Sequence, residues 1–141
     1  MKKRVLFLCT ANSSRSQMAE GMANHLWGDR IAAFSAGTQA TFVNRTAIEV
    51  MKEIGIDISN HRSKNLSEFD GQMFDYVITL CGSANETCPL YIGGTTKTHI
   101  GFDDPAKVNG TPEEILNEFR RVRDEIKDKL TAFFQAEKII N

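Results

Sequence analysis

A cysteine and an arginine lie six residues apart in a short polar segment near the N-terminus. The segment reads Cys9-Thr10-Ala11-Asn12-Ser13-Ser14-Arg15-Ser16. Only small residues separate the cysteine from the arginine, so the backbone can curl until several N–H groups point inward. The start of a helix would add partial positive charge there. With a bidentate fork from Arg15, residues 9–15 are predicted to bind a dianionic tetrahedral ligand, and we call them the oxyanion loop.

Cys9 is expected at the base of this loop, where the dipoles that hold an oxyanion also stabilise a thiolate. Ser16 is placed to donate a hydrogen bond to the sulfur. A lone cysteine at a strand end is usually a buried apolar thiol. The pattern C-x5-R-S between a predicted strand and a predicted helix instead favours a nucleophile. Neither a Walker loop nor a dinucleotide-binding glycine pattern occurs.

Predicted strands and helices alternate along the chain. Apolar runs predict strands at 3–8, 31–36 and 75–80, a weaker strand at 96–100, and helices at 15–27 and 44–54. The polar stretch 56–73 is expected to be loop with a short helix. The alternation predicts one α/β domain over residues 1–141 with a mostly parallel sheet. Ligands of such sheets bind beyond the carboxyl ends of the strands, which is where the oxyanion loop begins.

The last helix has the clearest local signals. Thr111 and Glu114 form a capping box, with Pro112 at the first helical position. An apolar stripe is expected in the core: Ile115, Phe119, Val122, Ile126, Leu130 and Phe133. The intervening charged residues are expected to be solvated: Arg120, Arg121, Arg123, Asp124 and Glu125. On the two earlier helices, Leu26 and Ile54 are expected to be on the buried faces.

The composition of the chain argues against several classes of protein. The net charge is -1, which argues against nucleic acid as a partner, and no apolar run is long enough to span a membrane. We therefore expect a cytoplasmic protein. The chain has three cysteines, and the cytoplasm keeps thiols reduced, so a structural disulfide framework is not expected. No Cys/His cluster has zinc-ligand spacing, and the three histidines are assigned no chemistry.

The motifs resemble those of the low-molecular-weight tyrosine phosphatase superfamily. Residues 9–20, C-T-A-N-S-S-R-S-Q-M-A-E, are similar to its active-site loop, and Asp103-Asp104-Pro105 resembles its acid loop. The resemblance implies a three-layer sandwich with a four-stranded parallel sheet. It also implies Asp104 as the general acid, with Asp103 as the alternative. Two chemistries occur in this superfamily: phosphoester hydrolysis through a phosphocysteine and arsenate reduction.

Two further cysteines favour the reductase. Cys81 directly follows a predicted strand, so it is expected at the same sheet edge as Cys9, and Cys88 follows seven residues later. The alternative is a pair of incidental thiols. The runs Thr79-Leu80-Cys81 and Cys88-Pro89 are similar to the thioredoxin-coupled arsenate reductases. Ala106 and Gln17 also stand where the phosphatase branch usually has an aromatic residue and a proline.

The resemblance implies a thiol relay. Cys9 attacks arsenate, a transient Cys9–Cys81 disulfide forms as arsenite leaves, and Cys88 converts it to a Cys81–Cys88 disulfide. Thioredoxin is the implied electron donor, with glutaredoxin as the alternative, and no tightly bound cofactor is expected. Phosphate and sulfate are expected analogues of arsenate. The protein is expected to be a monomer and to serve in arsenic detoxification.

Some relatives hold a potassium ion beside the loop. The matching residues here are Asn12, Glu20 and Ser35, but Arg62 and Lys64 occupy the region that supplies an aspartate in those relatives. We expect the Lys64 ammonium to pair with Glu20 in place of the cation, so no metal is predicted. The alternative is a solvated Lys64.

Overall fold

The four strands form one sheet in the order β2-β1-β3-β4, and every neighbouring pair is parallel. The structure is a computed structural model that describes residues 2–82 and 93–141. The elements in chain order are β1 (Lys3–Cys9), α1 (Arg15–Leu26), β2 (Ile31–Gly37), α2 (Arg45–Glu53), η1 (Leu66–Phe69), β3 (Phe74–Thr79), β4 (Gly94–His99), η2 (Pro105–Lys107) and α3 (Pro112–Ala136). The predicted α/β fold with a four-stranded parallel sheet is confirmed.

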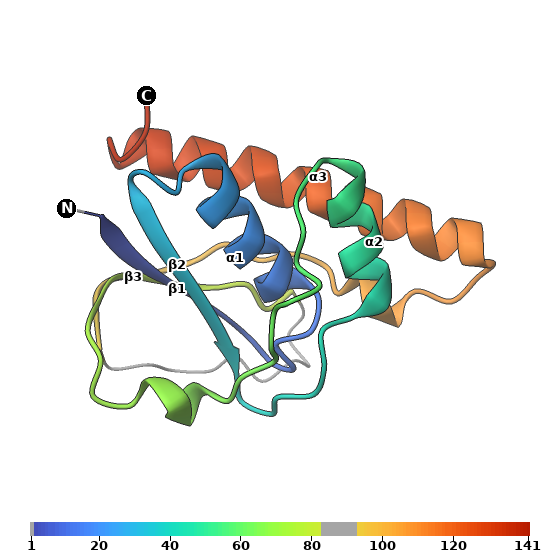
Figure 1. The fold of residues 1–141 in the computed structure, drawn as a ribbon, viewed down its shortest axis with the longest axis horizontal. Helices are drawn as coiled ribbons and strands as arrows, with labels where there is room; N and C mark the ends of the chain where they lie inside the picture. The colour runs from blue at the N-terminus through green and yellow to red at the C-terminus, as the bar shows by residue number, and fades with distance from the viewer. Residues whose placement is uncertain (1, 83–92) are drawn as a thin grey trace.

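The two faces of the sheet bury different clusters, because side chains alternate along each strand. On β1, Val5 and Phe7 belong to the cluster that includes residues of all three α-helices, whereas Leu6 and Leu8 pack with Phe69 of η1. Figure 1 shows the three helices on one side of the sheet, with α3 running across the other two. The resemblance implied a layer of structure on each face of the sheet. Within the described ranges, the short helix η1 is the element that covers the second face.

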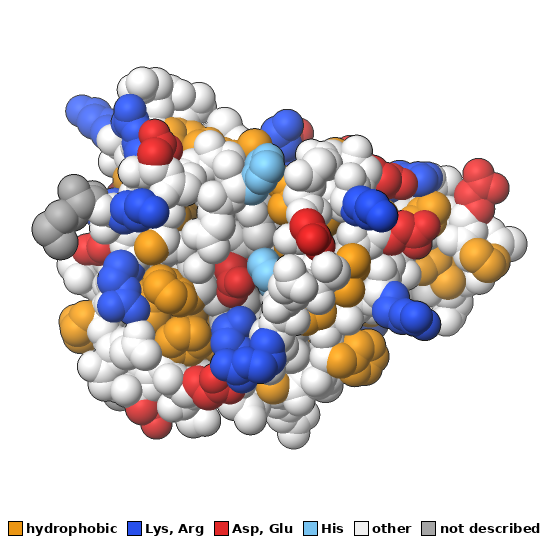
Figure 2. All heavy atoms as spheres, viewed as in Figure 1, with side chains coloured by type: hydrophobic (Ala, Val, Ile, Leu, Met, Phe, Trp, Pro, Cys, Tyr) orange, Lys and Arg blue, Asp and Glu red, His pale blue; other side chains and the backbone are white. Residues whose placement is uncertain are grey.

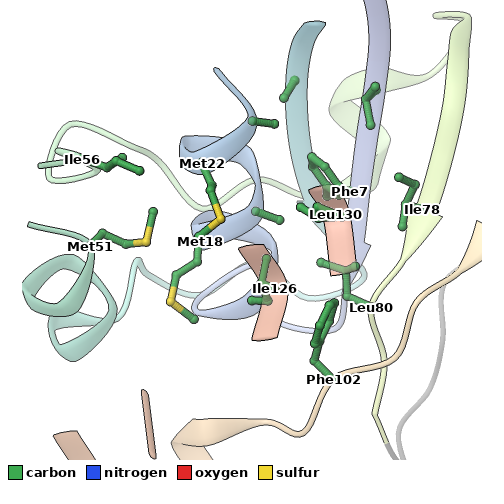
Figure 3. Close-up of a cluster of buried hydrophobic side chains, with 14 of the residues drawn as sticks. Phe7, Met18, Met22, Met51, Ile56, Ile78, Leu80, Phe102, Ile126 and Leu130 are labelled. Atoms are coloured by element: carbon green, nitrogen blue, oxygen red, sulfur yellow. The ribbon is translucent and has the colours of Figure 1, made fainter. Parts of the chain in front are cut away.

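The larger cluster lies between α3 and the sheet. Figure 3 shows Ile126 and Leu130 of α3 beside Phe7, with Leu80 and Phe102 nearby. All five side chains are almost completely buried. The core therefore extends to the sheet edge where β1 and β3 end, and it supports the loops that leave those strands.

Strand register brings the chemical segments together. Cys9 pairs with Gly37 of β2, and Leu8 pairs with Thr79 of β3. Leu80 continues this pairing, because its N–H donates to the Leu8 carbonyl oxygen at 2.8 Å. The next residue is Cys81, so Cys9 at the end of β1 and Cys81 two residues past β3 lie at the same carboxyl end of the sheet. The predicted shared edge is confirmed.

Two predicted core residues are exposed. Leu26 is 39% exposed and Ile54 is 37% exposed, although both fit the helical spacing of their neighbours. Leu26 is the last residue of α1, and Ile54 follows the last residue of α2. The buried faces of both helices were therefore predicted correctly, except at their C-terminal ends. The other members of these faces are buried: Ala19, Met22, Ala23, Ala47, Val50 and Met51.

Arg123 of α3 is buried, which corrects its predicted place on the solvated face. Its guanidinium donates to the Val50 carbonyl oxygen at 2.9 Å and forms ion pairs with Glu53 and Asp124. Val50 lies in the last turn of α2, where carbonyl groups lack helical partners, so Arg123 satisfies one of them. Hydrogen bonds from Arg120 and Arg123 hold the pKa of Glu53 below its usual value.

The predicted start of α3 is confirmed. Thr111 and Glu114 form both hydrogen bonds of the capping box, and Pro112 opens the helix. Phe133 is only half-buried, and its neighbour Phe134 completes the buried stripe. No helix within the described residues is long and apolar enough to cross a membrane.

Candidate active site

The carbonyl groups of the oxyanion loop are held from outside by the segment after β2. The backbone N–H groups of Gln39 and Thr41 donate to Thr10 and Ala11 at 3.0 and 3.2 Å. The Asn44 N–H donates to the Ser13 carbonyl oxygen at 3.1 Å. In a trans peptide the N–H points opposite to the carbonyl of the preceding residue. The amides of Ala11 and Ser14 therefore face away from this outer segment, as an oxyanion site requires.

A pocket of about 160 Å³ lies on the inner side of the loop. Its lining residues are Cys9, Ala11, Ser13, Ser14, Arg15, Thr41, Phe42, Asn44, Asp104 and Ala106. Of the predicted oxyanion-binding residues, Thr10 and Asn12 are not in this lining. A larger pocket of about 610 Å³ lies between α2 and α3 but contains no cysteine. We assign the chemistry to the smaller pocket, because the reactive and cationic side chains converge there.

The side chain of Asn12 holds the loop from behind. Asn12 is fully buried, and its φ of 49° lies in the left-handed region, which asparagine tolerates better than most residues. Its amide nitrogen donates to the hydroxyl oxygens of Ser16 and Ser35 at 2.7 and 2.9 Å. Its amide oxygen accepts from the Gln17 side chain at 2.9 Å and the Lys64 backbone at 2.8 Å. Every polar group of this side chain is thus used.

The predicted contact between Cys9 and Ser16 is present. The Cys9 sulfur lies 2.9 Å from the Ser16 hydroxyl oxygen. Because Asn12 already donates to that oxygen, the hydroxyl hydrogen is left to point at the sulfur. A hydrogen bond of this direction stabilises negative charge on Cys9.

Ser14 is one of the residues that line the pocket, and its hydroxyl is unpaired among the residues described. Its side-chain oxygen is buried and has no hydrogen-bond partner within the described part of the chain. Buried polar atoms are almost always paired in folded proteins. A ligand oxygen in the pocket would supply the missing partner.

Arg15 is positioned by residues 101–105, which we call the acid loop. One guanidinium nitrogen donates to the Phe102 carbonyl oxygen at 3.2 Å, and another lies 3.6 Å from the Asp104 carboxylate. The Asp104 carboxylate also accepts from the Ala106 N–H at 3.0 Å, in the turn that Pro105 begins. The carboxylate therefore stands beside the oxyanion loop.

The structure distinguishes the two aspartates. Asp103 is exposed and pairs with Arg121 of α3 at 3.1 Å, whereas Asp104 lines the pocket with Cys9. Only Asp104 is placed to exchange a proton with a ligand held over Cys9.

Cys81 is buried, and the residue after it packs tightly on the acid loop. A methyl group added to Gly82 would lie 2.0 Å from the Phe102 carbonyl oxygen. This is the same oxygen that accepts from Arg15. The segment that carries Cys81 and the arginine of the oxyanion loop therefore meet at one backbone carbonyl. Cys88 lies outside the described residues.

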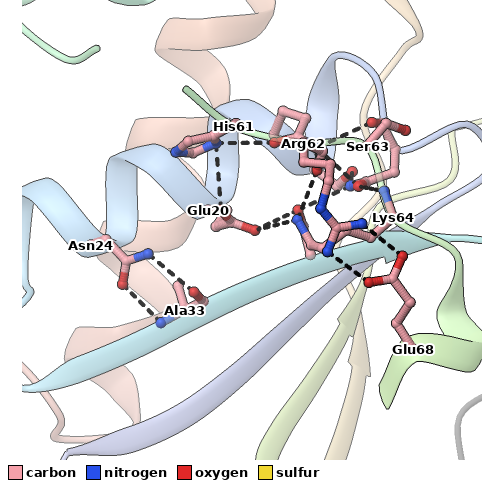
Figure 4. Close-up of polar contacts among 12 residues, drawn as sticks. Glu20, Asn24, Ala33, His61, Arg62, Ser63, Lys64 and Glu68 are labelled. Carbon is pink, nitrogen blue, oxygen red and sulfur yellow. Dashed lines mark hydrogen bonds and ion pairs between the residues drawn. The ribbon is translucent and has the colours of Figure 1, made fainter. Parts of the chain in front are cut away.

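A second polar cluster lies behind Asn12, and Figure 4 shows its members. The Ser35 hydroxyl donates to Glu20 at 2.6 Å, and the Lys64 ammonium lies 3.5 Å from the same carboxylate oxygen. Lys64 also donates to the Arg62 carbonyl oxygen at 2.9 Å. The expected pair between Lys64 and Glu20 is present. Among the residues that the structure describes, no group of three or more His, Cys, Asp or Glu side chains is placed to hold a metal ion.

His61 belongs to this cluster, although no motif in the sequence singles it out. The Gln17 amide nitrogen donates to Asn12 and to the Arg62 carbonyl oxygen, so its oxygen is free to accept from His61 Nδ1 at 3.0 Å. Burial lowers the pKa of His61, and the nearby Glu20 carboxylate partly opposes this shift. A neutral His61 with hydrogen on Nδ1 satisfies these contacts.

Comparison with known proteins identifies related chains. A sequence profile for the family described as low molecular weight phosphotyrosine protein phosphatase matches residues 4–139. An arsenate reductase of Halalkalibacterium halodurans is 48% identical over 137 residues, covering 97% of this chain and 99% of that protein. A solved arsenate reductase in the phosphate binding state has a TM-score of 0.79 at 35% identity, covering 96% and 98% of the two chains. A thioredoxin-dependent arsenate reductase from Corynebacterium glutamicum has a TM-score of 0.62 at 26% identity, covering 96% of this chain and 63% of the other.

Ser14→Ala is expected to separate ligand binding from stability. It removes a buried hydroxyl that has no partner among the described residues, so the free energy of unfolding should stay the same or rise by up to about 1–3 kcal/mol. Phosphate affinity should fall by roughly tenfold, the effect of one hydrogen bond to a charged group. Urea unfolding and phosphate protection of Cys9 against iodoacetamide measure the two effects. Ser67→Ala, at an exposed position of η1, is the control. Unchanged phosphate affinity in Ser14→Ala would refute the role of the Ser14 hydroxyl.

Gly82→Ala is expected to damage the oxyanion site from a distance. The new methyl group would overlap the Phe102 carbonyl, so the acid loop must move and release Arg15. Phosphate affinity of the reduced protein should fall by roughly tenfold or more in the same protection assay. Gly101→Ala is the graded comparison, because its methyl group would lie 3.0 Å from the Cys81 carbonyl oxygen and should cost less. Equal affinity in wild type and Gly82→Ala would show that this contact does not position Arg15.

Proposed function

Because this chain belongs to the low-molecular-weight phosphotyrosine protein phosphatase family, in which it matches arsenate reductases along its length, we propose that it reduces arsenate through a three-cysteine relay. The observation that supports this most strongly is the joint placement of the groups required. Cys9, Arg15 and Asp104 line one pocket, and Cys81 lies two residues past the end of β3, the strand beside β1. A phosphatase needs the first three groups, whereas a reductase also needs nearby thiols to supply two electrons.

The first step forms a covalent adduct. Three oxygens of arsenate are held by the loop amides, Ser14 and Arg15, so the fourth points away from Cys9 and toward the pocket opening. The Cys9 thiolate attacks arsenic opposite that oxygen, and the arsenic–oxygen bond breaks. The departing group is the hydroxyl of the arsenate dianion, so one proton from Asp104 lets it leave as water. The buried Ser16 hydroxyl stabilises the thiolate before attack.

The next steps transfer the electrons. The Cys81 thiolate attacks the Cys9 sulfur, and the arsenic–sulfur electron pair stays on arsenic, which leaves as arsenite. Cys88 then attacks Cys81, which frees Cys9 and leaves a Cys81–Cys88 disulfide. Because sulfurs must come into line for each exchange, we expect the contact between Gly82 and the acid loop to change during the relay.

Thioredoxin is the proposed electron donor that reduces the Cys81–Cys88 disulfide. The motifs around both cysteines are similar to the thioredoxin-coupled subfamily, and one structural relative is itself thioredoxin-dependent.

We further propose a cytoplasmic monomer. Figure 2 shows basic and acidic side chains interspersed on one face of the molecule rather than gathered into a field of one sign.

The relay predicts different products for the two cysteine variants. With arsenate, thioredoxin, thioredoxin reductase and NADPH, wild type should turn over, and both Cys81→Ser and Cys88→Ser should not. In a single turnover without thioredoxin, Cys88→Ser should release one arsenite per protein and accumulate a Cys9–Cys81 disulfide, which peptide mapping detects. Cys81→Ser should release none.

Phosphate protection of Cys9 in both variants is the control for an intact pocket. If wild type fails to reduce arsenate but hydrolyses aryl phosphate equally well in all three proteins, the protein is a phosphatase. Cys81 and Cys88 would then be incidental.

The Lys64–Glu20 pair predicts independence of potassium. An ammonium already lies 3.5 Å from the carboxylate and would be displaced only at the cost of that ion pair. Arsenate turnover of wild type should therefore be equal in potassium and sodium chloride at the same ionic strength. Lys64→Gln removes the positive charge and should slow turnover in sodium more than in potassium. A clear gain with potassium in wild type would contradict the proposed replacement.

A further inference from the structure

Phe42 is an exposed aromatic side chain that lines the Cys9 pocket. It is 66% exposed, the largest value among the exposed large hydrophobic residues described, yet it shares the pocket lining with Cys9 and Arg15. An aromatic ring in water gains no hydrophobic stabilisation. The proposed reduction of inorganic arsenate makes no use of it.

The backbone on both sides of Phe42 is held against the oxyanion loop. The Thr41 N–H lies 3.2 Å from the Ala11 carbonyl oxygen and 2.9 Å from the Ser63 hydroxyl. The Asn44 N–H donates to Ser13. The ring is therefore carried by a segment whose position is fixed relative to the ligand-binding amides.

The pocket changes character from base to rim. Its lining includes Cys9, Ser14 and Arg15, and the cationic guanidinium of Arg15 suits an oxyanion. At the rim, Phe42 offers an aromatic surface, and Ala106 is too small to fill the space. A ligand with a tetrahedral oxyanion at one end and a flat apolar group at the other matches both regions.

We propose that Phe42 forms a subsite for the aryl group of aryl arsonates, which bind this pocket without being reduced. The inference rests on the proposed function for its account of how arsenate is held. With three arsonate oxygens in the oxyanion loop, the fourth substituent points away from Cys9 toward the rim. In an aryl arsonate that substituent is the ring, which contacts Phe42.

The same orientation explains why no reduction follows. In-line attack by Cys9 needs a leaving group opposite the sulfur, and in arsenate that group is an oxygen that Asp104 protonates. In an aryl arsonate it is a ring carbon, which has no lone pair to accept a proton from Asp104. No arsenic–sulfur adduct forms on Cys9, so there is no adduct for Cys81 to attack. Aryl arsonates are therefore competitive inhibitors of arsenate reduction.

Matched arsonates test the subsite. Phenylarsonate and methylarsonate share a head group and differ in the ring, so the ratio of their inhibition constants against arsenate isolates the ring contact. Wild type should bind phenylarsonate roughly two- to tenfold more tightly, the range of one aromatic contact. The preference should fall toward one in Phe42→Ala and be intermediate in Phe42→Leu, which keeps apolar area but lacks the ring. Met73→Ala removes another exposed apolar side chain outside the pocket lining and should keep the wild-type ratio.

A second readout does not depend on reduction. Protection of Cys9 against iodoacetamide by the two arsonates should reproduce the same ratios. The subsite is refuted if methylarsonate protects as well as phenylarsonate, or if the preference survives in Phe42→Ala. Oxidation of NADPH driven by phenylarsonate would refute the claim that aryl arsonates are not reduced. Failure of wild type to reduce arsenate would overturn the proposed function, while the protection ratios would still decide the subsite.

Discussion

The site depends on a backbone curl that would be unstable without the buried side chain of Asn12. A loop that points its N–H groups inward must leave its carbonyls facing out, and its tightest residue must adopt a left-handed conformation. Asn12 meets this constraint because its amide pairs with neighbours on every side. The same four bonds direct the Ser16 hydroxyl to Cys9 and the Ser35 hydroxyl to Glu20. Loop shape, thiolate stabilisation and the ion pair behind the loop are consequences of one satisfied side chain.

The parts that could be predicted from sequence have local causes. The capping box of α3 needs only Thr111, Glu114 and the helix between them, and the strands follow from short apolar runs. The shared edge of Cys9 and Cys81 required one more step, that parallel strands end together. The choice of Asp104 over Asp103 came from resemblance, and the structure supports it through an outward ion pair that the sequence does not reveal.

The parts that could not be predicted are contacts to backbone atoms far away in the chain. Arg15 donates to the carbonyl of Phe102, and Arg123 donates to that of Val50. Every residue has a backbone carbonyl group, so the residue type at positions 102 and 50 does not reveal that their carbonyls accept these hydrogen bonds. For this reason the sequence pattern predicts Arg123 to be a solvated surface residue. The exposure of Phe42 could not be predicted for a different reason, because phenylalanine is usually buried and its neighbour Val43 does pack against the core.

The segment after β2 meets the oxyanion loop mainly through main-chain atoms, with N–H groups of Gln39, Thr41 and Asn44 donating to carbonyls. Main-chain bonds survive most changes of side chain. The residue at position 42 is thus free to vary while the loop keeps its shape. A lineage could exchange Phe42 for a small, charged or bulkier residue and alter which oxyanions enter, with the reactive centre untouched. Ligand specificity can therefore evolve at position 42 while the residues of the oxyanion loop and their chemistry are preserved.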